Sequence, residues 1–343
     1  MSKPKQAAWE NPRSILFIRP GGIGDAVHLL GAIRAVKDRY PESTITVLAE
    51  KRNAAIFTFC GAISRILLYE RPTELMAAIR GRFDAVIDTE QWHRLSAVIA
   101  RLSGAPLLVG YATNNRKKLF THPIPYCHDI RESESFLTLL QPLGISPATM
   151  SAPLLELPAE AVVAAEHKIA VLNGEPFVAL FPGASIPERR WGTEKFRNLA
   201  ERIHGWGRAV IVVGGKGDEA AGDAIVSGGV GLNLAGKTSL AETAALLQRC
   251  LLLVTGDSGL LHIAVELQVP TVSLFGPGIE QKWAPRGGQH IVLNKYLSCS
   301  PCTRFGYTPR CRFGANCLDQ ITVDDVEQAV RRILGSSHFP GSE

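Results

Sequence analysis

No apolar run in the sequence approaches the roughly 18 residues that a membrane-spanning helix needs. The first residues, MSKPKQAAWENPRS, contain no apolar stretch of the kind that a signal peptide requires. The sequence also contains no GxxxxGK(S/T) phosphate loop, no GxSxG nucleophile elbow and no HExxH zinc motif. We therefore expect a cytoplasmic protein, and the motifs give no support to P-loop, serine-hydrolase or zinc-peptidase chemistry.

Repeats and low-complexity tracts are also absent, and 46% hydrophobic with 20% charged residues is typical of a soluble globular protein. A chain of 343 residues is long enough for two domains. The net charge of +5 is small and dispersed. It suits an anionic substrate or an anionic membrane surface, and it gives no reason to expect nucleic acid as a partner.

Apolar runs of strand length alternate with helical periodicity along most of the chain. In the first half we expect strands at residues 14–19, 44–49, 65–69, 85–88 and 107–110, and the alternation starts again at residue 177. This pattern predicts an α/β fold with two doubly wound parallel sheets. The proline-rich stretch 147–158 marks a boundary between domains at 14–158 and 159–334, and it stays open whether the last helix, 323–334, packs back on the first domain. A cleft between the domains, facing the carboxyl ends of the strands, is the natural ligand site.

Residues 251–277, LLLVTGDSGLLHIAVELQVPTVSLFGP, read as strand, tight turn, helix and strand. Such a unit places a helix N-terminus, with its free N–H groups, at the end of the first strand, where it favours an anion. Ser258 and Gly259 would approach a phosphate, flanked by Asp257 and His262. An ordinary capped helix explains the same residues equally well.

The turn that follows the first expected strand, PGGIGDAVH, has three glycines in four positions, including Gly22, so a backbone or ligand can approach closely. Its spacing does not match the GxGxxG dinucleotide fingerprint, which disfavours NAD. Asp25 opens the following helix. It is either a carboxylate favoured by the helix dipole or a general base that accepts a proton from an acceptor hydroxyl.

Two further loops carry polar side chains at expected strand ends. In PGASIPERRW, Arg189 and Arg190 suit a diphosphate and Ser185 adds a hydroxyl, although solvated arginines are the competing interpretation. In GGKGDE, which ends with Glu219, a carboxylate could accept hydrogen bonds from a ribose or an adenine amino group. The segment 113–133 is basic and irregular, and a helix is expected at 134–143.

Four of the seven cysteines cluster near the C-terminus with the spacing C-x2-C-x8-C-x5-C. Four thiolates could hold a structural zinc or iron ion, but this spacing matches no known finger, and chance clustering in a loop-rich segment explains it as well. The candidate ligands are Cys299, Cys302, Cys311 and Cys317.

Three blocks, RPGGIGDAVHLLGAIRAVK, FPGASIPERRWGTEKFRNLAERI and TGDSGLLHIAVELQVPTVSLFGP, together resemble glycosyltransferase family 9, the heptosyltransferases of lipopolysaccharide core assembly. The resemblance implies a GT-B fold with the acceptor on the N-terminal domain and ADP-heptose on the C-terminal one. It implies inverting transfer that needs no metal, with Asp25 at the position of the catalytic base. The GDAVH stretch resembles heptosyltransferase I more than heptosyltransferase II.

Other site residues follow from the same resemblance. Arg189 stands where the family has a lysine that contacts the diphosphate or heptose. Ser185 takes one of two threonine positions before it, and Ala184 replaces the other. The block with Asp257, Ser258, Gly259 and His262 would surround the phosphates and heptose, and Thr238 and Glu219 would lie near the nucleoside. Some related protein heptosyltransferases carry iron on cysteines.

We therefore expect heptose transfer from ADP-heptose to an anionic lipid-linked sugar at the cytoplasmic face of a bacterial inner membrane. Basic side chains would attract acceptor phosphates or carboxylates, namely Lys51, Arg52, Arg116 and Lys117. A protein acceptor, another nucleotide sugar, a nucleotide-sugar epimerase and a non-catalytic sugar-nucleotide scaffold remain alternatives.

Overall fold

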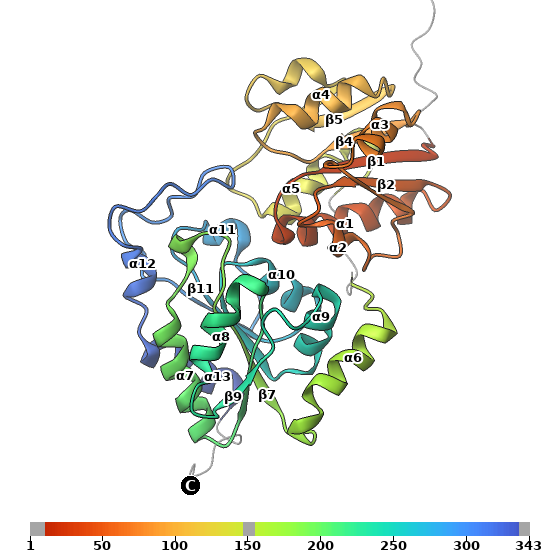
Figure 1. Ribbon diagram of the computed structural model, residues 1–343. Helices are drawn as coiled ribbons and strands as arrows, with labels where there is room; N and C mark the ends of the chain where they lie inside the picture. The colour runs from red at the N-terminus through yellow and green to blue at the C-terminus, as the bar shows by residue number, and fades with distance from the viewer. Residues whose placement is uncertain (1–10, 147–154, 336–343) are drawn as a thin grey trace, which may run out of the picture. The chain divides into compact units, whose positions relative to one another are not determined.

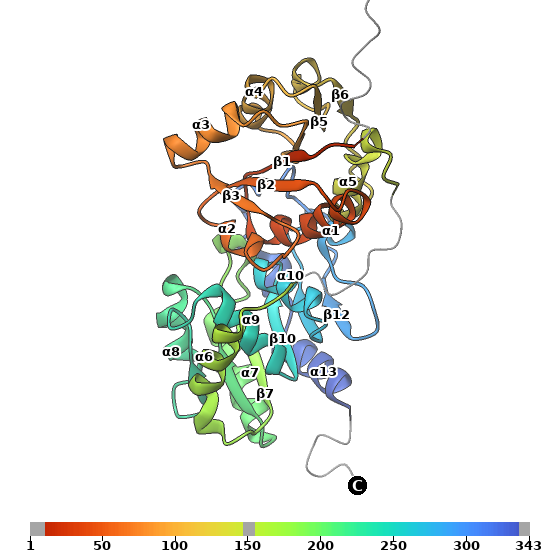
Figure 2. The same cartoon turned by 90° about the vertical axis from the view of Figure 1, so that its right-hand side faces the viewer.

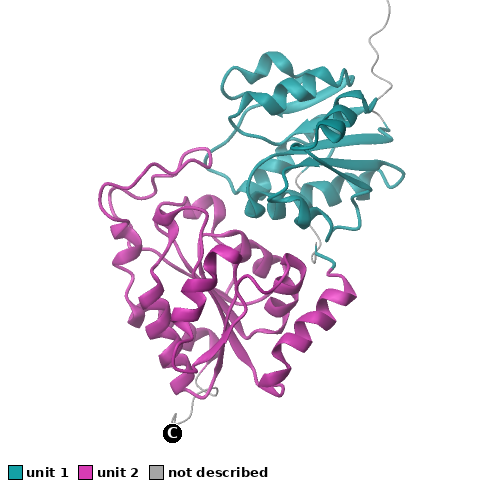
Figure 3. Ribbon diagram, in the orientation of Figure 1, with its two compact units in different colours: residues 1–156 teal, residues 157–343 magenta. Residues whose placement is uncertain are grey.

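The computed structural model describes residues 11–146 and 155–335. The first ten residues and most of the expected boundary segment 147–158 lie outside this range. The chain forms two compact units, residues 1–156 and 157–343 (Figure 3). Within the described residues, no helix combines the length and the apolar composition that crossing a membrane demands.

The first unit contains a six-stranded sheet with the order β3-β2-β1-β4-β5-β6, and every pairing is parallel. Helices cover the sheet (Figure 1). Because both faces are covered, the strands are apolar runs, and Ile15 to Ile18 of β1 are completely buried. The elements are β1 (Ser14–Arg19), α1 (Ile23–Arg39), β2 (Thr44–Ala49), α2 (Ala54–Phe57), β3 (Arg65–Leu68), α3 (Pro72–Arg80), β4 (Ala85–Asp88), α4 (Arg94–Leu102), β5 (Leu107–Tyr111), η2 (Arg116–Leu119), β6 (His122–Ile124), α5 (Glu132–Thr138) and η3 (Gln141–Leu143).

The second unit repeats this architecture with the order β12-β11-β10-β7-β8-β9, again with parallel pairings. Its main core joins the sheet to α7 and α13. The elements are α6 (Ala159–Ile169), η4 (Ala170–Leu172), β7 (Phe177–Phe181), η5 (Pro187–Arg189), α7 (Thr193–Gly205), β8 (Ala209–Val212), η6 (Lys216–Asp218), α8 (Glu219–Ile225), β9 (Gly231–Asn233), α9 (Leu240–Arg249), β10 (Leu252–Gly256), α10 (Gly259–Glu266), β11 (Thr271–Leu274), α11 (Glu280–Trp283), β12 (His290–Leu293), α12 (Asn316–Asp319) and α13 (Val323–Leu334).

Both sheets have the Rossmann order, in which the chain starts in the middle, runs to one edge and then returns to build the other side. The direction reverses between β1 and β4 in the first unit and between β7 and β10 in the second. The predicted α/β class with two doubly wound parallel sheets is confirmed. Ligands of such sheets bind where the strand order reverses, so a ligand site is expected at each of these two places.

The structure differs from the sequence expectations at the margins of the sheets. The segment 113–133 is not wholly irregular, because it contains η2 and the edge strand β6, and the helix expected at 134–143 is the shorter α5 followed by η3. The last helix, whose packing the sequence left open, is part of the second unit: α13 buries Val326 and Val330 in the core that also contains β7 and α7 (Figure 2).

Candidate active site

At the reversal point of the first unit, β1 leads through a glycine turn into α1. Gly21 has a φ of +120°, which only glycine adopts without strain, and Gly22 is the N-cap of α1. Gly22 provides no side-chain cap, so the first-turn carboxylate of Asp25 is the acidic group nearest the free N–H groups of the helix start. The turn therefore places Asp25 at the carboxyl end of the central strand.

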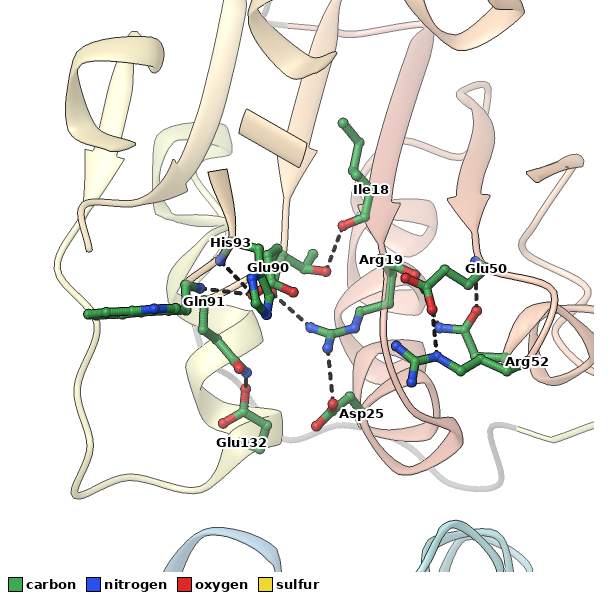
Figure 4. A network of polar contacts seen from close by, with 12 residues as sticks. Ile18, Arg19, Asp25, Glu50, Arg52, Glu90, Gln91, His93 and Glu132 are labelled. Carbon is green, nitrogen blue, oxygen red and sulfur yellow. Dashed lines mark hydrogen bonds and ion pairs between the residues drawn. The ribbon is translucent and has the colours of Figure 1, made fainter. Parts of the chain in front are cut away.

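Arg19, the last residue of β1, holds this carboxylate in place (Figure 4). Its Nη1 donates to the Thr89 carbonyl at 2.9 Å and its Nη2 donates to Asp25 Oδ2 at 3.0 Å. Burial acts to lower the pKa of Arg19, but the carboxylates of Asp25, Glu90 and Glu132 raise it above its ordinary value, so the guanidinium stays charged. Arg19 is only 2% exposed whereas Asp25 is 27% exposed, so a fixed buried cation orients a carboxylate that solvent can reach.

A second layer of polar groups surrounds Arg19. Glu90 accepts hydrogen bonds from the Trp92 and His93 N–H groups, at 2.9 and 3.1 Å. Burial acts to raise the pKa of Glu90, but Arg19 and these two donors lower it, so this carboxyl is ionised beside the guanidinium. Figure 4 shows the Gln91 side chain pointing at Glu132, to which its Nε2 donates. The side chains that orient Asp25 are thus themselves tied to backbone and side-chain partners.

Arg116 does not have the role expected from the sequence. It is completely buried, and its Nη2 donates to Asp88 Oδ2 while its Nη1 donates to the Glu90 carbonyl. The expectation that Arg116 attracts an acceptor is therefore wrong, because its charge is neutralised inside the unit by a buried carboxylate. Lys51, Arg52 and Lys117 are exposed, as a role in attracting an anion requires.

The reversal point of the second unit brings together residues from the ends of β7 and β10. Arg189, at the end of the loop after β7, lies with Nη1 3.1 Å from Oδ2 of Asp257, which follows β10. Asp257 is 6% exposed and Arg189 17% exposed. The Arg189 Nη2 also lies 3.4 and 3.3 Å from the hydroxyls of Thr303 and Thr308. A partly exposed guanidinium is thereby fixed beside the start of α10.

The start of α10 has the form expected for an anion site. Ser258 is the N-cap and accepts a hydrogen bond from the Leu261 N–H at 3.3 Å, while its hydroxyl lies 3.0 Å from that of Thr255. Gly259 is the first helical residue and His262 is buried in the first turn. The free N–H groups of this turn and the nearby Arg189 together favour a phosphate group.

The remaining predicted residues lie in loops of the second unit with less support from their neighbours. Ser185 and Arg190 are exposed, and Arg190 Nη2 donates to the Ala184 carbonyl at 3.2 Å. The Glu219 carboxylate packs against Gly236 so closely that a Cβ added to this glycine would clash with Glu219 Oε1. The hydroxyl of Thr238 lies 2.8 Å from that of Thr243. Glu219 and the turn before Thr238 are therefore neighbours.

Sequence reasoning missed Arg19, Thr303 and Thr308. Arg19 ends an apolar strand, where a charged residue among buried neighbours could have signalled a paired site. Thr303 and Thr308 come from a loop more than a hundred residues after Arg189. No local pattern in the sequence joins them.

The four clustered cysteines are free thiols in different surroundings, since Cys299 is exposed, Cys302 and Cys311 are half-buried and Cys317 is buried. Burial raises the pKa of the Cys302 and Cys317 thiols, and the charges of neighbouring cysteines in the cluster raise it further. Within residues 11–146 and 155–335, no three His, Cys, Asp or Glu side chains are arranged as a metal site. The geometry therefore gives the predicted zinc or iron site no support.

Comparison with known proteins identifies the family of the chain. Residues 73–309 match the family described as glycosyltransferase family 9 (heptosyltransferase). The chain belongs to glycosyltransferase family 9. It is therefore a glycosyltransferase, and its two Rossmann-like units are those of the GT-B fold that the resemblance implied.

Individual relatives are distant but span most of the chain. Lipopolysaccharide heptosyltransferase 2 of Salmonella typhimurium is 26% identical over 299 residues, which cover 77% of this chain and 82% of the relative. The structure of E. coli ADP-heptose lps heptosyltransferase II superposes with a TM-score of 0.76 at 22% identity, covering 94% of this chain and 98% of that one. E. coli heptosyltransferase WaaC with ADP-2-deoxy-2-fluoro heptose gives a TM-score of 0.70 at 18% identity, covering 93% and 99%.

Proposed function

We propose that this glycosyltransferase moves heptose from ADP-heptose to an anionic lipid-linked sugar, with inversion at the anomeric carbon. The observation that carries the proposal is the Asp25 carboxylate, which is held by the buried guanidinium of Arg19 and still reaches solvent. A general base needs this combination of fixed orientation and access to the proton that it removes. Relatives named as heptosyltransferases support the choice of sugar.

In the proposed reaction Asp25 takes the proton of the acceptor hydroxyl as the oxygen attacks the anomeric carbon. The bond between that carbon and the ADP oxygen breaks, and the electron pair leaves with the diphosphate. Arg189 and the N–H groups at the start of α10 would stabilise this charge, with Ser258 and Gly259 nearest the phosphates. No step requires a metal ion.

The role of Asp25 is tested with Asp25→Asn, which keeps an oxygen that can accept from Arg19 and removes the basic carboxylate. We expect kcat to fall by about 10²–10⁴-fold, the usual contribution of a general base, while ADP affinity measured by calorimetry stays within twofold. Asp38→Asn, at an exposed position near the end of the same helix, is the matched control and should behave as the wild type. Normal turnover by Asp25→Asn would refute the assignment.

The donor site is tested by comparing arginines of the second unit. Arg189→Met should weaken ADP binding at least tenfold, because one charge-assisted hydrogen bond is worth about 1.5–3 kcal/mol. Arg190→Met should weaken it less, since Arg190 is exposed and contacts a backbone carbonyl. Arg197→Met, on the solvent side of α7, is the control. Equal affinities for all four proteins would contradict a donor site at Arg189.

Within this proposal the acceptor is that of a type I heptosyltransferase, which the GDAVH stretch favours. Relatives named as heptosyltransferases 1, 2 and 3 have similar identities, so product analysis must decide. Mass spectrometry after incubation with ADP-heptose and deep-rough lipopolysaccharide should find one added heptose. Transfer only to an acceptor that already carries heptose would contradict the type I assignment, and isomerised donor without an acceptor product would indicate an epimerase.

A further inference from the structure

Helix α4 of the first unit exposes large apolar side chains on the face that points away from the sheet. Ala97, Ile99 and Ala100 are buried against the unit. Outside this buried arc, three side chains spaced by three and four residues share one exposed stripe, Leu95 at 65% exposure, Val98 at 41% and Leu102 at 60%. Packing within the unit explains only the buried face of this helix, because the described residues of the unit do not cover the exposed apolar face.

The neighbouring helix exposes a further apolar side chain. Helices α3 and α4 lie side by side (Figures 1 and 2), and Met76 of α3 is 41% exposed. Single exposed apolar residues are common on protein surfaces, but three on one face of a helix, with a fourth on the adjacent helix, form a larger apolar surface. We call Met76, Leu95, Val98 and Leu102 the α4 patch.

The charged residues of α4 and η2, on one side of the α4 patch, are all positive. Arg94 and Arg101 lie along one edge of the α4 stripe, and η2, which packs beside α4, adds the exposed Lys117 and Lys118. Residues 91–128 contain five Lys and Arg residues and neither Asp nor Glu. Of the basic side chains at the rim, Arg101, Lys117 and Lys118 make no ion pair with a carboxylate of the described residues. On the side of α4 and η2 the rim is therefore positive. On the side of α3, Glu74 lies two residues before Met76 and is paired with Arg71.

We propose that the α4 patch and its basic rim dock this unit on the surface of an anionic lipid bilayer. The apolar side chains of the patch could insert at the boundary between headgroups and acyl chains. The Lys and Arg side chains beside them would be attracted to anionic headgroups. An apolar protein partner would explain the patch but not the positive charge of α4 and η2 beside it, so charge complementarity favours the lipid surface. The inference deepens the proposed function, since an acceptor carried by a lipid is presented at such a surface.

The location of the patch fits this role within the first unit. Helix α4 begins six residues after Asp88, in the segment that contains Thr89 and Glu90, which contact or surround Arg19. The connection from β4 to α4 thus leads into the docking surface and also carries residues that hold Arg19, which in turn orients Asp25 on α1. Docking through α4 would bring the acceptor-binding unit, and not a remote part of the chain, to the lipid.

Vesicle flotation with the full chain tests the proposal. Vesicles of phosphatidylcholine with 30% phosphatidylglycerol should bind the protein at least tenfold better than phosphatidylcholine alone, and 0.5 M NaCl should remove most of this difference. Leu95→Ser/Leu102→Ser should reduce binding at least tenfold. Arg101→Gln/Lys118→Gln should remove the preference for the anionic lipid. All four positions are exposed, so the melting temperature should not change.

The matched control is Val163→Ser/Val171→Ser, which removes two apolar side chains of 52% and 67% exposure from the second unit and should leave binding unchanged. Equal binding to both kinds of vesicle, or wild-type binding by the Leu95→Ser/Leu102→Ser protein, would overturn the proposal. The proposal would also be overturned if ultracentrifugation found a dimer that Leu95→Ser/Leu102→Ser dissociates, because a second copy of the chain would then cover the patch. The vesicles contain neither donor nor acceptor, so this result is independent of whether heptose transfer is correct.

Discussion

Replacing Arg116 by methionine should reveal how strongly the first unit depends on one buried ion pair. Arg116 and Asp88 are both completely buried, and the same guanidinium binds the Glu90 carbonyl. Methionine has a similar length but leaves the Asp88 carboxylate without its cation. Removing one partner of a buried pair costs about 3–5 kcal/mol, which is a large part of the total stability of a domain.

A double-mutant cycle separates the ion pair from the packing of the two side chains. Asp88→Asn/Arg116→Met leaves no buried charge, so we expect it to be destabilised by only about 1–2 kcal/mol, less than either single variant. Urea unfolding followed by circular dichroism gives the free energies. Lys117→Met, one residue along and exposed, is the control and should lie within about 0.5 kcal/mol of the wild type.

The effect of pH gives a second test of the same variant. Burial raises the pKa of Asp88 to about 6 although Arg116 opposes the rise. A carboxyl whose pKa is higher in the folded state than in the unfolded state is penalised above the folded pKa, and the penalty is lost as the pH falls toward the unfolded value of about 4. Arg116→Met should therefore be less destabilised at pH 5 than at pH 8. The reasoning would be refuted if the losses in free energy of unfolding of the two single variants added up in the double variant. It would also be refuted if the destabilisation of Arg116→Met did not change with pH.

Three other changes have outcomes that follow from the structure. Arg19→Lys keeps the charge, but lysine cannot bond both the Thr89 carbonyl and Asp25. Steady-state kinetics should therefore show a kcat about 10–100-fold lower and an unchanged KM for ADP-heptose. A change in KM alone would contradict a positioning role. Burial raises the pKa of Glu266 to about 7, so Glu266→Gln should increase the free energy of unfolding at pH 8 by about 1–3 kcal/mol, a gain that disappears by about pH 4, as urea titrations at both pH values would show. Gly278→Ala would place a Cβ 2.2 Å from Asp257 Oδ2 and should weaken ADP binding about tenfold by calorimetry, whereas Gly288→Ala, with open space around it, should not.

The central strands and most long helices could be predicted because they are buried on the faces that the pattern identifies. Strand β1 is an uninterrupted apolar run that the structure buries completely. Strand β6 was missed because it has only three residues at a sheet edge, and one of them is Pro123, which cannot donate to a ladder. The edge strand β12 is half-buried along its whole length, so its pattern gives no clear face.

Some residues of the candidate site could likewise be predicted from local sequence features, and others could not. Residues in glycine turns at strand ends, such as Asp25 and Asp257, could be found because the turn and the helix start are local features of the sequence. Arg116 was misjudged because its run of three basic residues resembles an exposed patch, and its partner Asp88 is 28 residues away. Partners brought together only by the sheet, as Arg19 is with Thr89, are set by strand order and leave no mark in sequence spacing.

Each unit carries its own reversal point and its own means of orienting a charged side chain. Arg19 and Thr89 belong to the same unit as Asp25, and Thr303 and Thr308 belong to the same unit as Arg189. Exchange of the segment before Leu157 between members of the family would transplant the proposed base together with its supports, and leave the proposed diphosphate contacts untouched. Acceptor choice could thus diversify among descendants of one ancestral gene while the donor stayed the same.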